Sequence, residues 1–209
     1  MCIRDSSIGG LMALEFCTMF PQYVKKLISI SSGYKLSTLQ TLHNLEQAYI
    51  LDLGRESKNR NIEYLSLARM IAHKTYISLE LLSNRAKSET LYDDDLIKGF
   101  LSTPQESYMM HQGEKFIERF TPESYLSIIK GWQNFKIEQK DLNKLKDIET
   151  LVISVDSDVC FYPEEQKEFL EILNNYDIIT TYSTINSTKG HDSFLLEPEL
   201  FEDTLKNFL

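Results

Sequence analysis

Three segments of the chain carry side chains that could act together as a nucleophile, an acid and a base. Ser7 precedes the pair Gly9-Gly10, and an exposed serine on a tight strand-to-helix turn needs such small neighbours. Asp158 and His191 lie in polar segments near the other end of the chain. A neutral imidazole can take the proton of a serine hydroxyl, while a carboxylate fixes the tautomer and stabilises the imidazolium. Taken singly, the three segments are also explained as a helix N-cap, a turn and a packed histidine.

The order Ser, Asp, His along the chain makes the catalytic interpretation stronger than any one segment does. It is the chain order of triads in α/β-hydrolase folds. Asp158 and His191 each follow a predicted strand, and the loops after parallel strands lie along one edge of a sheet. The backbone N–H of Ile8, the residue after the nucleophile, is placed to donate to an oxyanion. We therefore predict a triad of Ser7, Asp158 and His191, with Ile8 as an oxyanion donor.

The elements that must position these residues alternate between strands and helices at both ends of the chain. Short β-branched runs bounded by turn residues predict strands at residues 27–31, 150–155 and 178–185. Apolar residues at helical spacing predict helices at residues 11–20, 164–173 and 196–208. This alternation predicts an α/β fold in which helices cover the faces of a short parallel sheet.

The middle of the chain, residues 35–147, is predicted to be helical throughout. Apolar residues recur in it at helical spacing, as in Leu42, Leu45, Tyr49 and Leu53. The segment is far longer than a crossover between parallel strands requires. We interpret it as a helical cap inserted over the C-terminal edge of the sheet, with residues 7–34 and 148–209 forming the core. Residues 1–6 are predicted to be an extraneous leader.

Composition excludes several classes of protein and partner. The chain has 22 basic and 31 acidic residues, a formal net charge of -9, which disfavours nucleic acid as a partner. Its three cysteines lack paired spacing and indicate a reducing compartment. No apolar run is long enough to span a membrane, and the four histidines form no metal-binding motif. We expect a soluble cytoplasmic protein without a metal site.

Several motifs resemble the homoserine O-acetyltransferase family of the α/β-hydrolase superfamily. They are the serine turn and helix, the next strand, parts of the cap, the acid loop and the histidine loop, at residues 7–16, 23–31, 112–126, 156–166 and 190–195. The resemblance implies that Ser7 is the nucleophile, Asp158 the acid and His191 the base, with Asp192 facing the substrate's ammonium group. It implies acetyl-CoA as a co-substrate, no bound cofactor, and a homodimer formed through the cap.

Three departures from this family bear on the prediction. The family has a long segment before the serine turn, and Asp5 stands where its glycine belongs, so we expect an N-terminally truncated chain that is inactive as it stands. The family's Thr-Tyr-Arg motif ends here in Ile77, which removes the arginine thought to hold the substrate's carboxylate. The cap's usual Ala, aliphatic, Asp run reads Gly-Trp-Gln at residues 131–133, which alters the pocket.

Three functions remain open on this basis. The first is acyl-CoA-dependent O-acyl transfer to a small hydroxylated amino acid, by a ping-pong route through acyl-Ser7. The second is a carboxylic-ester hydrolase that uses the same triad with water as acceptor, which the loss of arginine at Ile77 favours. The third is a non-catalytic fragment whose exposed sheet edge would bind a partner or aggregate.

Overall fold

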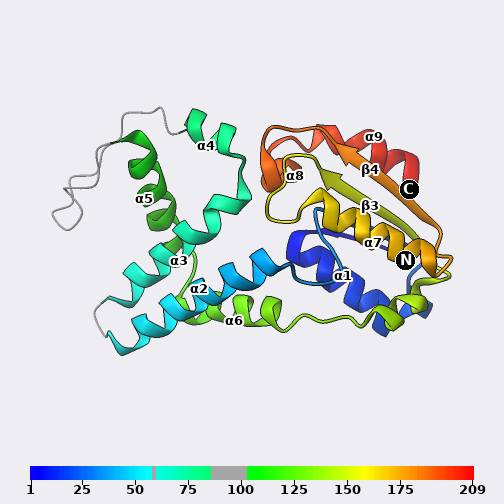
Figure 1. Ribbon diagram of the computed structural model, residues 1–209, viewed down its shortest axis with the longest axis horizontal. Coiled ribbons are helices and arrows are strands. Elements are labelled where there is room, and N and C mark those ends of the chain that lie inside the picture. Colours follow the sequence, from blue (N-terminus) through cyan, green and yellow to red (C-terminus); the bar gives the residue numbers. More distant parts are fainter. Residues whose placement is uncertain (58–59, 86–102) are drawn as a thin grey trace. The chain divides into compact units, whose positions relative to one another are not determined.

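The structure, a computed structural model, describes residues 1–57, 60–85 and 103–209 of the chain. It divides into two compact units (Figure 1). Residues 1–37 and 135–209 form the first, here called the sheet unit, and residues 38–134 form the second, the helical unit. The division falls inside the predicted cap, because residues 135–147 belong to the sheet unit. The insertion between the two parts of the sheet unit is therefore shorter than 35–147.

The sheet unit is built on four parallel strands in the order β1-β2-β3-β4. Their bounds are β1 (Cys2–Ser6), β2 (Lys26–Ile30), β3 (Glu149–Val155) and β4 (Thr180–Ile185). The three predicted strands are confirmed, with ends that differ by at most two residues. Short β-branched runs identified these strands, because the side chains of a strand are apolar on both sides when both faces of the sheet are covered.

Strand β1 occupies residues that the sequence predicts to be a leader outside the fold. It pairs in parallel with β2, with Cys2 opposite Lys26 and Ser6 opposite Ile30. Its side chains are exposed or half-buried and include Arg4 and Asp5, so no apolar alternation marks the strand. Backbone N–H and C=O groups, which every residue type except proline carries, hold these residues in the sheet instead.

Helices cover both faces of this sheet. The sheet unit contains α1 (Ser7–Met19), η1 (Pro21–Tyr23), η2 (Gln139–Leu145), α7 (Pro163–Asn175), η3 (Gly190–Asp192), α8 (Ser193–Leu196) and α9 (Glu199–Phe208). Leu27 and Val152 pack on one face in a core shared with α1, η2 and α7. Ile28 and Ile153 pack on the other face, where Phe201 of α9 is buried. Neighbouring residues of a strand point to opposite faces, so each strand contributes to both cores.

The helical unit consists of five helices in the described residues. They are α2 (Thr38–Glu56), α3 (Asn61–Tyr76), α4 (Leu79–Arg85), α5 (Pro104–Ile117) and α6 (Pro122–Gln133). Helices α5 and α6 each begin with a capping box, at Thr103 and Thr121, followed by proline at the first helical position. Such caps satisfy the N–H groups that a helix start leaves without partners. The predicted helical character of this region is confirmed for the residues described.

Helix α2 presents its apolar residues to solvent. Their exposed fractions are 50%, 60%, 62% and 47%, for Leu42, Leu45, Tyr49 and Leu53. The buried positions of the same helix are Gln40, Asn44, Gln47, Leu51 and Gly54, and three of these five carry polar side chains. The apolar spacing therefore predicted the helix correctly, but these apolar residues lie on its exposed face and not on its buried face.

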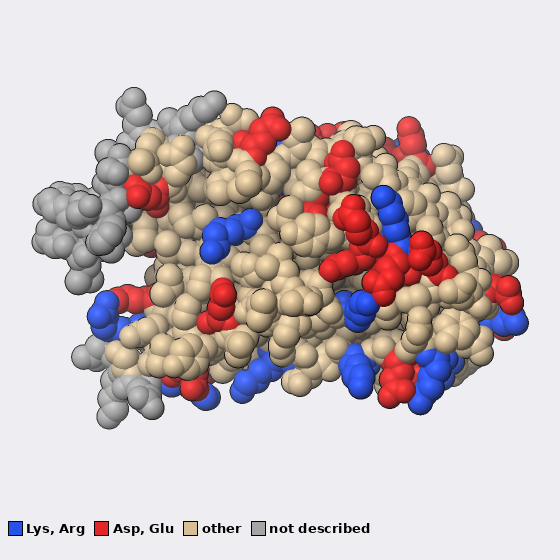
Figure 2. Space-filling model, viewed as in Figure 1, with Lys and Arg blue, Asp and Glu red and all other residues tan. Residues whose placement is uncertain are grey.

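The surface of the molecule is acidic, as the composition requires. Figure 2 shows acidic side chains gathered where Figure 1 places α7, whose acidic residues are Glu164, Glu165, Glu168 and Glu171. None of the helices in the described part of the chain has the length and apolar character that crossing a membrane requires.

Candidate active site

Ser7 stands on a strained turn between β1 and α1. It is the first residue of the helix, directly after the strand, and its φ is 55°. A residue other than glycine rarely adopts a positive φ, and the conformation costs about 1–3 kcal/mol. A serine on a sharp strand-to-helix turn is the arrangement that exposes the nucleophile at the edge of an α/β-hydrolase sheet.

A fixed neighbour requires glycine at position 10, whereas Gly9 faces only the exposed and movable carboxyl group of Asp5. A Cβ atom on Gly10 would lie 2.6 Å from the Cβ and Oγ atoms of Ser32, and one on Gly9 would lie 2.4 Å from the carboxyl group of Asp5. Any side chain at Gly10 would therefore displace Ser32, which is fully buried. Gly10 thus marks the point where the first turn of α1 meets the segment after β2.

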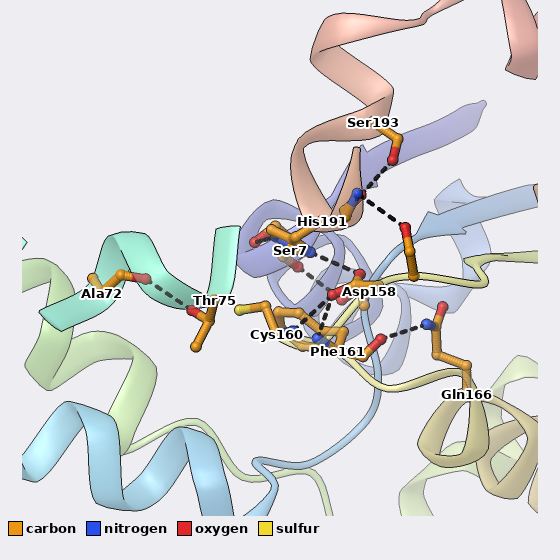
Figure 3. Close-up of polar contacts among 12 residues, drawn as sticks. Ser7, Ala72, Thr75, Asp158, Cys160, Phe161, Gln166, His191 and Ser193 are labelled. Carbon is orange, nitrogen blue, oxygen red and sulfur yellow. Dashed lines mark hydrogen bonds and ion pairs between the residues drawn. The ribbon is translucent and has the colours of Figure 1, made fainter. Parts of the chain in front are cut away.

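The structure brings Ser7, Asp158 and His191 together in one hydrogen-bonded line (Figure 3). The Nε2 atom of His191 lies 2.8 Å from the Oγ atom of Ser7. The Nδ1 atom of the same ring lies 2.8 Å from the Oδ2 atom of Asp158. The three residues come from the ends of β1, β3 and β4, which lie along one edge of the sheet because the strands are parallel.

The second oxygen of Asp158 is held by the backbone of its own loop. The N–H groups of Cys160 and Phe161 both donate to Oδ1, each at 2.8 Å. Asp158 is 1% exposed, so both carboxylate oxygens are bound rather than hydrated. A buried carboxylate is tolerated when its oxygens have such partners, and here they also fix its orientation toward the imidazole.

The imidazole of His191 is buried between two aromatic rings. Phe161 stacks on it with ring centres 5.4 Å apart, and Phe194 meets it edge-on at the same distance. Burial is the largest single influence on its pKa and lowers it, but the charge and hydrogen bond of Asp158 and the charge of Asp192 raise it. The net result is a pKa of His191 above the ordinary value of 6.5.

The loop that carries the base is tied to the loop that carries the acid. Ser157 donates a hydrogen bond to the carbonyl of Ser187 and accepts one from the N–H of Gly190 at 3.0 Å. Asp156 accepts from the N–H of Ser187 at 3.0 Å. The sequence marks Asp156 and Ser157 only as turn residues, because their partners lie about thirty positions away. These contacts fix the spacing between the predicted acid and base.

Of the remaining predicted site residues, Ile8 and Asp192 are the chain neighbours of Ser7 and His191. Ile8 is in the first turn of α1. The N–H groups of a first turn have no acceptor within the helix, and the helix dipole is positive at that end. Asp192 follows His191 in η3 and is half-buried. Ile77 belongs to the helical unit and is 1% exposed. Across the described ranges, no three His, Cys, Asp or Glu side chains are grouped so as to hold a metal ion.

Curated relatives match the chain along almost its whole length. No model of a known protein family matches it. It is 34% identical over 221 residues to the homoserine O-acetyltransferase of Methanosalsum zhilinae, covering 99% of this chain and 44% of that protein. It is 32% identical over 223 residues to the homoserine O-acetyltransferase of Pelagibacter ubique, covering 99% of this chain and 60% of that protein. The chain spans about half the length of these relatives.

Solved structures with the same fold include both transferases and esterases. A homoserine O-acetyltransferase from Bacillus anthracis superposes with a TM-score of 0.86 at 14% identity, over 99% of this chain and 59% of that one. Esterase E22 superposes with a TM-score of 0.86 at 15% identity, over 99% of this chain and 60% of that one. Together with the parallel sheet and its flanking helices, these likenesses show that the fold is that of the α/β-hydrolases, as the sequence predicted.

Proposed function

The chain belongs to the family of the homoserine O-acetyltransferases, and on that premise we propose that the protein transfers an acyl group from acetyl-CoA, or another acyl-CoA, to the hydroxyl of a small amino acid. The observation that carries the proposal is the hydrogen-bonded line from Ser7 through His191 to Asp158. It provides a nucleophile, a base in contact with it and a carboxylate that orients the base.

In the first half-reaction, Ser7 takes the acyl group. Nε2 of His191 accepts the proton of Ser7 Oγ as that oxygen attacks the thioester carbonyl, and the N–H of Ile8 donates to the oxyanion that forms. The carbon–sulfur bond then breaks, and the sulfur of CoA leaves with the proton held by His191. The products of this half-reaction are free CoA and acyl-Ser7.

In the second half-reaction, the acyl group passes to the acceptor. His191 accepts the proton of the acceptor's hydroxyl, and the resulting oxygen nucleophile attacks the ester carbonyl of acyl-Ser7. The bond to Ser7 Oγ breaks and His191 returns the proton to that oxygen. Asp192, beside the base, is proposed to attract the ammonium group of the acceptor, while Asp158 stabilises the imidazolium in both half-reactions.

Ester hydrolysis is the second candidate function. In that reaction water replaces the amino-acid hydroxyl in the second half-reaction, and the same three residues act. The superposition on esterase E22 equals that on the transferase from Bacillus anthracis, at a TM-score of 0.86. The sequence has isoleucine at position 77, where the family has an arginine thought to hold the substrate's carboxylate, and this difference favours an acceptor without a carboxylate.

Acylation of Ser7 can be tested with the purified 209-residue chain by intact-mass analysis after incubation with acetyl-CoA. Intact-mass analysis detects a covalent acyl-serine even where turnover is slow. Transfer predicts that an added hydroxylated amino acid removes the acyl group from Ser7 and accelerates CoA release, whereas an esterase cleaves an aryl acetate without any acceptor.

The variant Ser7→Ala should lose acylation and both activities. Ser6→Ala is the matched control, because Ser6 is the neighbouring residue and its side chain makes no capping hydrogen bond. We expect that variant to be acylated at a rate close to that of the unmodified chain. Acylation or ester cleavage that survives in Ser7→Ala would remove the triad from the mechanism.

A further inference from the structure

We infer that Ser32 is a positioning residue for the site, holding Ser7 and the N–H of Ile8 through one hydrogen bond from its buried hydroxyl. The inference rests on the proposed role of Ser7 as nucleophile. The hydroxyl of Ser32 donates to the backbone carbonyl of Ser7 at 2.7 Å, across 25 residues of sequence. Ser32 is 0% exposed, so its hydroxyl has no access to solvent, whereas Ser7 is half-buried.

The bond joins two strained turns at the same edge of the sheet. Strands β1 and β2 are paired neighbours, with Ser6 opposite Ile30. The chain leaves them through Ser7 and Ser31, whose φ angles are 55° and 44°. A residue with positive φ persists only when the surrounding structure holds it. Ser32 follows Ser31 in the second turn, and its hydrogen bond to the carbonyl of Ser7 restrains the first turn.

The second turn is itself fixed to the sheet. The N–H of Ser31 donates to the carbonyl of Ile153 in β3 at 2.8 Å. Ser32 also lies so close to α1 that only glycine fits at position 10, where an added Cβ would meet its side chain at 2.6 Å. The hydroxyl of Ser32 is therefore held against the first turn of α1 rather than reaching it from a mobile loop.

One peptide plane links this bond to the chemistry. The carbonyl of Ser7 and the N–H of Ile8 belong to the same planar peptide unit, so fixing the oxygen also fixes the direction of the N–H. That N–H is the proposed oxyanion donor, and Ser7 itself is the proposed nucleophile. A carbonyl oxygen has two lone pairs, so the hydroxyl of Ser32 can be accepted alongside the helical bond of α1. Ser32 thus restrains both groups without touching a substrate.

The test uses a fluorophosphonate probe that labels an active serine, followed by intact-mass analysis of the 209-residue chain. The variant Ser32→Ala should lower the maximal labelling rate by about tenfold or more, since small misplacements of reacting groups can cost up to about 10²-fold. The probe concentration giving half of the maximal rate should stay unchanged, because Ser32 does not bind the probe. A merely structural role would not separate these two quantities.

Ser29→Ala is the matched control. Ser29 lies on β2, is 1% exposed, and its hydroxyl has no hydrogen-bond partner among the described residues. Its removal should leave the labelling rate within about twofold of the unmodified chain, since no bond is lost. Ser32→Cys keeps a similar side-chain volume but donates weakly, so its rate should fall between those of serine and alanine. That variant decides the question if Ser32→Ala does not fold.

The outcomes separate this inference from the proposed function. If Ser7 is labelled in the unmodified chain but Ser32→Ala and Ser32→Cys label as fast as Ser29→Ala, the positioning role is wrong and the nucleophile stands. If the unmodified chain is not labelled, or labelling persists in Ser7→Ala, the proposed nucleophile is wrong and the positioning role falls with it.

Discussion

His191 must be neutral to accept the proton of Ser7, and its surroundings set the pH at which this holds. Burial lowers the pKa of the imidazole, while Asp158 and Asp192 raise it further than burial lowers it. The folded protein therefore keeps the proton on His191 to a higher pH than the ordinary value of 6.5. Acylation should increase with pH through this raised pKa, so the midpoint of its acid limb should lie above 6.5.

Asp158→Asn should reduce the acylation rate by about 10⁴-fold, because an amide cannot stabilise the imidazolium and favours the wrong tautomer. The midpoint of the acid limb should also move to lower pH, since the charge and hydrogen bond that raise the pKa of His191 are lost. The measurement is the acylation rate between about pH 5 and 9, the range in which histidine titrates. Asp203→Asn, an exposed position on α9, is the control and should change neither quantity. An unshifted midpoint in Asp158→Asn would contradict this account of His191.

The residues that meet in the site were predictable from sequence to different degrees. Ser7, Asp158 and His191 could be predicted, because their types, their order and their positions after strands all point to one chemistry. Ser32 and Ser157 could not, since a serine after a strand is an ordinary turn residue. Their roles depend on hydrogen bonds to partners 25 and 30 or more residues away, which only the packed loops bring into reach.

At the scale of elements, the close packing at the start of α1 can be tested by comparing alanine substitutions at two helical glycines. Gly10 of α1 is buried against Ser32, whereas a Cβ on Gly131 of α6 would meet nothing within 4 Å. Gly10→Ala should lower the free energy of unfolding by about 1–3 kcal/mol through overpacking, and should also slow acylation of Ser7. Gly131→Ala should raise the free energy of unfolding by about 0.5–1 kcal/mol, because alanine is the better residue in an exposed helix.

Urea unfolding followed by circular dichroism measures both changes. The pair controls for the general effect of replacing glycine by alanine in a helix, so the difference between the two variants reports the contact with Ser32. Equal effects of the two substitutions on stability would mean that Ser32 yields without cost, and would contradict the close packing at the start of α1.

The elements themselves were predictable where side chains carry the pattern. Strands β2, β3 and β4 have apolar β-branched runs, because helices cover both faces of the sheet. Strand β1 lacked such a run, since its side chains are mostly exposed and backbone pairing alone places it. The C-terminal helix expected at 196–208 is α9, which begins only at Glu199, whereas Leu196 ends α8; Pro198 separates the two helices because it cannot donate the N–H that would continue α8.

At the scale of the whole molecule, the exposed apolar residues of α2 form a stripe on one side of the helix, and this stripe is suited to contact with a second copy of the chain. We propose that two copies of the chain associate through Leu42, Leu45, Tyr49 and Leu53, which follow one side of the helix. Large exposed apolar patches mark interaction sites in soluble proteins, and a two-fold dimer pairs the same surface on both copies. The buried side of the helix carries Leu51 together with the polar residues Gln40, Asn44 and Gln47, so the stripe lies on the other side and does not contribute to the described core.

Replacing Leu45 with glutamate should shift the chain toward monomer, because a charge at the centre of this stripe must be desolvated when two copies meet. Analytical ultracentrifugation at micromolar concentration measures the shift. Leu67→Glu is the control: Leu67 is 43% exposed on α3, outside the stripe, and the substitution there should leave the oligomeric state unchanged. An unmodified chain that sediments as a monomer would refute the proposed dimer.

The helical unit is one uninterrupted stretch that leaves the sheet unit after Ser37 and returns to it at Phe135. Ser7, Asp158 and His191 all lie outside that stretch, in the sheet unit. A change confined to residues 38–134 therefore leaves every residue of the hydrogen-bonded line unaltered. Exchanging this block between relatives would replace one continuous segment of the gene while keeping the codons of those three residues.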